Sequence, residues 1–107
     1  MSADLSIPVS DPRLLAAAHS LAMLRSQRQP GPRVSESFAL AGLDEAYQVQ
    51  SAGMQRGLAQ GRHLSGAKAG LTSAALRAAL KVEEPLYGWL FADSACHSGD
   101  TIAWERL

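Results

Sequence analysis

The sequence has one cysteine, no block of like charge and no apolar run long enough to cross a bilayer. Cys96 alone cannot form an internal disulfide or a multi-cysteine zinc site, so the sequence predicts a reduced, partly buried thiol. Ten basic side chains balance ten acidic ones, and the electrostatic footprint of a nucleic-acid-binding protein is missing. No apolar segment approaches the roughly 20 residues that a membrane span needs.

The beginning of the sequence also lacks the pattern of a secretory leader. Asp4 and polar residues occupy positions where a leader would have a basic start followed by an apolar stretch. We therefore expect a cytoplasmic protein without nucleic-acid or membrane partners. What is present is typical of one small globular domain: 107 residues, of which 47% are hydrophobic and 19% are charged.

Two amphipathic helices are predicted in the first 60 residues. The first begins at Ser10 or Asp11, which can cap it, and ends by about residue 28, before a break that contains two prolines and a glycine. The second runs from about residue 43 to 59, and Gly61 terminates it. Their apolar faces are predicted at helical spacing, at Leu14, Leu15, Ala18, Leu21 and Ala22 in the first helix and at Leu43, Ala46, Tyr47, Gln50, Met54 and Leu58 in the second.

The second half of the sequence alternates between strand and helix patterns. Strands are predicted at residues 63–71, 86–92 and 101–105, where small, aromatic or β-branched residues lie between turn residues. A short helix is predicted from Ser73 to Lys81, with Ala75, Leu76, Ala79 and Leu80 on its buried side. The fold class that follows is α+β, with N-terminal helices followed by short strands and one short helix.

Residues 66–72 (GAKAGLT) are the most informative stretch. Lys68 lies between two glycines, Gly66 and Gly70, at the end of a predicted strand and before a predicted helix that Thr72 or Ser73 can cap. Glycines leave room for a ligand or a neighbouring strand, so this arrangement can present a single cation to a pocket. Without further information, a lysine that simply reaches solvent is the simpler interpretation.

Three blocks of sequence, taken with the spacing between them, favour a pocket position for Lys68 over a solvent-exposed one. They are residues 43–50 (LDEAYQVQ), 66–72 (GAKAGLT) and 84–91 (EPLYGWLF). Together they resemble the 2-keto-4-pentenoate hydratase family, which belongs to the fumarylacetoacetase superfamily. The resemblance covers residues 38–107. It divides the single domain into a variable helical lead, 1–37, and a family-like part, 38–107, and it implies the N-terminal domain of a fumarylacetoacetase-like hydratase.

The resemblance implies an enzyme of aromatic-compound catabolism. Members of the family add water to 2-hydroxypenta-2,4-dienoate, and close relatives of the 4-oxalocrotonate type decarboxylate 2-oxo diacids. The resemblance assigns Lys68 to the substrate pocket, as an acid or base or as a binder of the substrate carboxylate, with Leu71 and Thr72 as further substrate-binding residues. It also implies a small-molecule substrate and a homo-oligomer.

The family uses a divalent metal, Mg²⁺ or Mn²⁺, held by two glutamates one residue apart and a third carboxylate. The resemblance implies that these ligands fall beyond Leu107, so we expect a catalytic domain outside this sequence, no metal bound by this chain alone and no activity of the chain alone. The adjacent pair Glu83 and Glu84 is not a substitute, because neighbouring side chains on a regular element point in different directions. A non-catalytic binding or assembly module is the alternative from another class.

Overall fold

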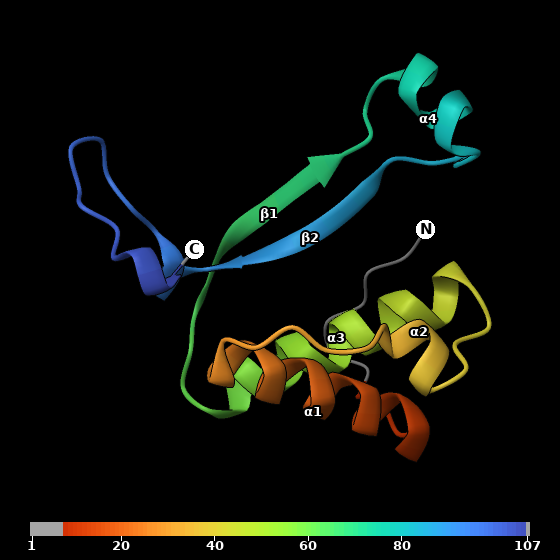
Figure 1. Ribbon diagram of the computed structural model, residues 1–107, viewed down its shortest axis with the longest axis horizontal. Helices are drawn as coiled ribbons and strands as arrows, with labels where there is room; N and C mark the ends of the chain where they lie inside the picture. The colour runs from red at the N-terminus through yellow and green to blue at the C-terminus, as the bar shows by residue number, and fades with distance from the viewer. Residues whose placement is uncertain (1–7, 107) are drawn as a thin grey trace.

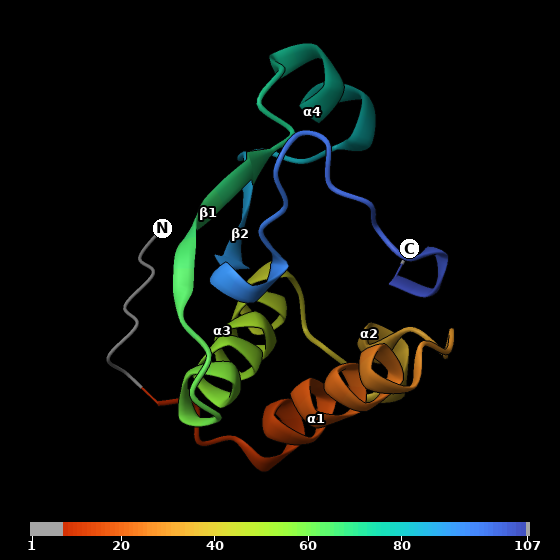
Figure 2. The same cartoon turned by 90° about the vertical axis from the view of Figure 1, so that its left-hand side faces the viewer.

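The computed structural model describes residues 8–106, and these form an α+β fold. The elements in chain order are α1 (Pro12–Gln27), α2 (Val34–Ser37), α3 (Leu43–Ala59), β1 (Leu64–Gly70), α4 (Ala74–Leu80), β2 (Leu86–Phe91) and two 3₁₀ turns, η1 (Ala92–Ser94) and η2 (Trp104–Arg106). Figures 1 and 2 show the β1–β2 sheet standing over the α1–α3 helix pair, with α4 at its far end. Asp4, used above against a secretory leader, lies outside the described residues.

The ends of α1 follow from its capping residues. The side chain of Asp11 accepts a hydrogen bond from the backbone N–H of Arg13 (2.9 Å), and Pro12 occupies the first turn, where its missing N–H costs nothing. At the other end Arg28 adopts a left-handed conformation (φ 55°), and its N–H bonds back to the carbonyl groups of the last turn. The predicted helix is therefore confirmed at both ends.

The second predicted helix is also confirmed, as α3. Asp44 and Glu45 lie in its first turn, where negative charge suits the positive end of the helix dipole. Gly61 follows the helix with φ 88°, a conformation that glycine adopts without strain, and its N–H bonds to the carbonyl of Leu58 (3.0 Å). None of the helices within residues 8–106 combines the length and the hydropathy that a membrane span requires.

The core lies between α1 and α3 and is built largely from small residues. Its buried members are Leu14, Ala17, Ala18, Val49 and Ala52. The predicted faces are partly wrong: Leu15, Leu21, Leu43 and Leu58 are exposed by 40–46%. Alanines at the contact let the two helices approach closely, so each helix turns its alanine-containing stripe toward the other and several leucines remain outside.

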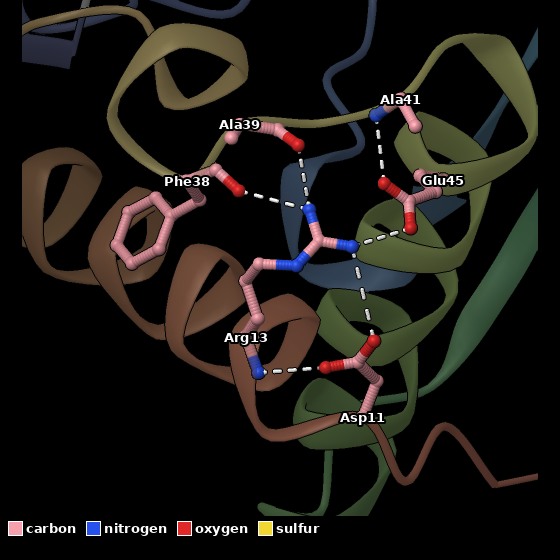
Figure 3. A network of polar contacts seen from close by, with 6 residues as sticks. All are labelled: Asp11, Arg13, Phe38, Ala39, Ala41 and Glu45. Carbon is pink, nitrogen blue, oxygen red and sulfur yellow. Dashed lines mark hydrogen bonds and ion pairs between the residues drawn. The ribbon is translucent and has the colours of Figure 1, made fainter.

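A polar network joins α1, the segment after α2 and α3 (Figure 3). The guanidinium of Arg13 donates to the carbonyl oxygens of Phe38 (2.9 Å) and Ala39 (2.7 Å) and to the carboxylate of Glu45. Glu45 also accepts from the backbone N–H of Ala41 (2.7 Å). One arginine on the first turn of α1 therefore fixes the course of the chain into α3.

The two strands pair antiparallel, with Lys68 opposite Gly88 and Ala67 opposite Trp89. The register shifts between Leu64 and Gly66, which indicates a bulge at the start of β1. Strand β1 is exposed along nearly its whole length. The predicted strands at 63–71 and 86–92 are confirmed.

Aromatic side chains attach this sheet to α3. The rings of Tyr47 and Tyr87 stack with their centroids 4.4 Å apart, and the hydroxyl of Tyr47 accepts the backbone N–H of Tyr87 (3.2 Å). Nearer the other end of β2, the ring of Phe91 lies so close to Gly57 that a Cβ on the glycine would be 2.5 Å from the ring. Helix α3 therefore covers β2 rather than β1.

Three predictions in the second half of the chain are wrong. Helix α4 forms as predicted, but Ala75, Leu76, Ala79 and Leu80 are exposed because no other described element packs against them. Residues 101–105 form no strand; a strand needs a partner for its backbone hydrogen bonds, and within residues 8–106 the sheet contains only β1 and β2. Cys96 is exposed rather than partly buried.

Candidate functional site

A cleft of about 690 Å³ lies between three walls: the second half of α1, the middle of α3, and the β1–β2 sheet with the turn that follows it. Leu21 and Ala22 line it from α1, and Met54 lines it from α3. Of the four leucines that the helix pair leaves exposed, Leu21 therefore lines this cleft. Lys68 lines the cleft from β1.

Gly88 lies beside Lys68 and Gln50. A Cβ built on Gly88 would lie 3.8 Å from Oε1 of Gln50 and 4.0 Å from Cγ of Lys68, so it would be in ordinary van der Waals contact with both side chains. The side chain of Lys68 is exposed, and no described Asp or Glu pairs with it. Its ammonium group is thus available to a ligand.

Gln50 and Trp89 line the cleft beside Lys68 and carry buried polar atoms without partners. Nε2 of Gln50 and Nε1 of Trp89 are both buried, and neither donates a hydrogen bond to any described residue. Buried donors without a hydrogen-bond partner cost free energy in a folded protein, and both of these donors belong to residues that line the same cleft.

Arg62 and Asp93 close the end of the cleft where the chain enters β1 and leaves β2. Nε and Nη2 of Arg62 donate to the two carboxylate oxygens of Asp93, both at 2.7 Å, and its guanidinium carbon lies 3.9 Å from the centre of the Phe91 ring. Hydrogen bonding to Asp93 raises the pKa of Arg62 above its ordinary value, despite partial burial. This bidentate pair joins the segment between α3 and β1 to the turn that follows β2.

The ionisable side chains that line the cleft are all basic: Arg25, Arg62 and Lys68. Divalent cations such as Mg²⁺ need carboxylate or carbonyl ligands, and no Asp or Glu lines this cleft. In addition, no group of three or more His, Cys, Asp or Glu side chains in residues 8–106 could hold a metal ion. The residues of the cleft therefore fit an anion and do not fit a divalent metal.

Leu71 and Thr72 lie outside the lining of the cleft, unlike Lys68. Leu71 adopts a left-handed conformation (φ 53°), and this conformation turns the chain out of β1. Its carbonyl oxygen accepts a hydrogen bond from Nη1 of Arg77 (2.9 Å). Ser73, next to Thr72, caps α4 by accepting the N–H of Leu76 (3.3 Å). Leu71 and Thr72 therefore lie in the connection between β1 and α4, and their contact with a substrate stays a prediction.

Sequence reasoning missed Arg25, Arg62 and Trp89 as lining residues. Trp89 belongs to the 84–91 block, but a tryptophan in a strand is usually a core residue, so its position in the sequence did not indicate that it lines a cleft. Arg62 and Asp93 are 31 positions apart, and only the pairing of β1 with β2 brings them together. An arginine two residues before one strand and an aspartate two residues after its partner strand is the pattern that would have found the pair.

Comparison with solved structures defines the class of protein. The fold is similar to that of 4-oxalocrotonate decarboxylase from Pseudomonas putida G7, solved in complex with calcium and acetate (TM-score 0.68, 33% identity) and with magnesium and adipate (TM-score 0.67, 33% identity). The similarity covers 74% of this chain and 30% of each decarboxylase chain. No family model matches the sequence.

Curated sequences identify the family. The chain is 38% identical over 102 residues to 2-keto-4-pentenoate hydratase 1 from Dechloromonas aromatica, a match that covers 92% of this chain and 39% of the relative. It is 35% identical over 90 residues to 2-oxo-hept-4-ene-1,7-dioate hydratase from Escherichia coli, with 84% of this chain and 34% of the relative covered. The chain belongs to the 2-keto-4-pentenoate hydratase family, and it spans about two fifths or less of the length of these relatives.

Proposed function

We propose that this chain forms one wall of the active site of a hydratase that adds water to a 2-hydroxy-dienoate, with Lys68 in contact with the substrate. The observation that supports it is the position of Lys68: a cation without an acidic partner among the described residues, in a cleft that no acidic side chain lines. The identities to hydratases, over most of the chain, supply the reaction class.

The chemistry of this wall is the binding and orientation of an anion. The ammonium group of Lys68 pairs with the substrate carboxylate and holds the conjugated chain along the cleft, where Leu21 and Met54 offer apolar contact. A divalent cation, which the solved relatives contain, would polarise the substrate oxygens, and its ligands would have to come from residues that do not line this cleft. The domain division at residue 38 and a homo-oligomeric assembly remain predictions.

The test is turnover of the native gene product on 2-hydroxypenta-2,4-dienoate, followed by the loss of dienoate absorbance. Lys68→Ala should lower turnover by about 10²-fold or more, because substrate binding and proton movement both depend on a positioned cation. Lys81→Ala is the matched control, since it removes the same charge from an exposed site outside the cleft, and it should leave turnover unchanged. A Lys68→Ala variant with near-normal turnover would remove this residue from the mechanism.

The second candidate is decarboxylation of a 2-oxo diacid, which is favoured by the fold similarity to 4-oxalocrotonate decarboxylase. Release of carbon dioxide from 4-oxalocrotonate, measured on the same variants, separates the two reactions. A native gene product that performs neither reaction would support the non-catalytic binding or assembly module instead.

A further inference from the structure

Gln50 is a polar residue on the face of α3 that packs against the sheet. Tyr47 lies three positions before it and Met54 four positions after it, so the three side chains share one stripe of the helix. The hydroxyl of Tyr47 has a partner in the backbone N–H of Tyr87, and Met54 is buried. Nε2 of Gln50, by contrast, is buried and donates to no described residue. This face of α3 therefore carries a donor that the fold does not satisfy.

The side chain of Lys68 is a neighbour of Gln50. Oε1 of Gln50 and Cγ of Lys68 lie 3.8 Å and 4.0 Å from the Cβ position built on Gly88. Gly88 is the residue opposite Lys68 in the antiparallel strand pair, and all three residues line the same cleft. An amide from α3 and a lysine from β1 therefore reach the cleft next to the same glycine of β2.

A carboxylate can accept from both groups at once, because its two oxygens offer about four acceptor sites. The ammonium group supplies charge, and the amide N–H supplies a directed hydrogen bond that is stronger to an ionised oxygen than to a neutral one. We propose that Gln50 is a second substrate-binding residue, in which Nε2 donates a hydrogen bond to the carboxylate that Lys68 binds. This bond fixes the orientation of the carboxylate in the cleft. The proposal rests on the proposed function for the class of ligand, a 2-hydroxy or 2-oxo acid with one carboxylate.

A structural role for Gln50 makes the opposite prediction about stability. If the amide held the fold together, an apolar residue of similar length in its place would lower the melting temperature. A donor that only a ligand satisfies costs stability in the ligand-free protein, so the same replacement removes that cost. Methionine is the suitable replacement, because it is unbranched, similar in length to glutamine and without an N–H group.

The experiment is isothermal titration calorimetry of the native gene product with 2-oxopentanoate, together with thermal unfolding of the ligand-free protein. This monoacid has the same carbon chain as the dienoate but no carbon–carbon double bond, so it can bind without being hydrated. Gln50→Met should weaken binding by about tenfold and should not lower the melting temperature. Gln50→Glu should weaken binding further, because it replaces the donor with a carboxylate that repels the ligand and attracts Lys68.

Gln48→Met is the matched control. It makes the same change at an exposed position of α3 that does not line the cleft, and it should alter neither the affinity nor the melting temperature. Equal losses of affinity in the Gln50→Met and Gln48→Met variants would overturn the proposal. So would a native protein that does not bind 2-oxopentanoate, or a Gln50→Met variant that binds it as the native protein does. A lowered melting temperature of Gln50→Met would assign the amide to the fold and would also overturn the proposal.

Because binding is measured without turnover, the outcome is separate from that of the proposed function. A protein that does not hydrate the dienoate, but whose binding of 2-oxopentanoate depends on Gln50, would retain this inference and reject the hydratase. A protein that hydrates the dienoate, and whose Gln50→Met variant keeps the KM and the affinity of the native protein, would do the reverse.

Discussion

Arg13 shows how one side chain determines the path of a chain of this size. It lies on the first turn of α1, yet its partners are two carbonyl groups some 25 residues later and the carboxylate of Glu45 on α3. The acidic first turn of α3 can be read from the sequence. The contact between Arg13 and Glu45 cannot, because it depends on how α1 packs against α3.

The Arg13–Glu45 contact should make the stability of the fold depend on pH. Hydrogen bonds from Arg13 and from the N–H of Ala41 lower the pKa of Glu45 below its ordinary value near 4.5. A lowered folded-state pKa means that the stabilisation is complete above the ordinary value and is lost as the pH falls through the lowered one. Glu45→Gln should therefore lower the melting temperature at pH 7 and make melting less sensitive to acid.

Thermal unfolding followed by circular dichroism at about pH 7 and about pH 3 checks this. Glu36→Gln is the control, because Glu36 pairs with Arg33 at 3.7 Å in an exposed i,i+3 contact that contributes little. Equal acid sensitivity in the wild type and the Glu45→Gln variant would show that the network does not contribute through the charge of Glu45.

At the scale of the elements, the junction between α3 and β2 depends on the absence of a side chain. Gly57→Ala gains helix propensity of about 1 kcal/mol, but its Cβ would lie 2.5 Å from the Phe91 ring, and overpacking costs roughly 1–3 kcal/mol. Gly53→Ala, one turn earlier, meets nothing within 4 Å and should only gain. Chemical denaturation should therefore find Gly53→Ala more stable than the wild type and Gly57→Ala less stable; equal gains would mean that the ring moves aside freely.

The elements were largely predictable, and their faces were not. Capping residues such as Asp11 and Ser73, and terminators such as Gly61, are local signals, so the helix ends could be located from the sequence. Which face is buried depends on partners: α4 was given an apolar buried side that includes Leu76, but no described element covers it. Lys68 was assigned to a pocket by the resemblance, because its flanking glycines alone left a solvent-exposed lysine as the simpler interpretation. Arg25 could not be assigned to the lining of the cleft, because its position there depends on how α1 packs relative to the sheet.

Across the whole molecule, burial is concentrated in the α1–α3 pair, and the sheet is attached mainly through β2. Backbone amides of α1 and α3 should therefore exchange with solvent deuterium much more slowly than those of β1 and α4, which are exposed. Hydrogen exchange read by mass spectrometry measures this peptide by peptide. Uniform protection in the native gene product would indicate that further structure covers β1 and α4.

The remote position of α4 has a practical consequence. The segment that joins β1 to β2 extends away from α1 and α3, as Figures 1 and 2 show, and its turn at residues 81–84 is largely exposed. No residue of this segment lines the cleft. Exposed turns of this kind accept inserted peptides well. A fluorescent label or an affinity tag placed there would leave the lining of the cleft untouched and would allow the protein to be followed by optical methods.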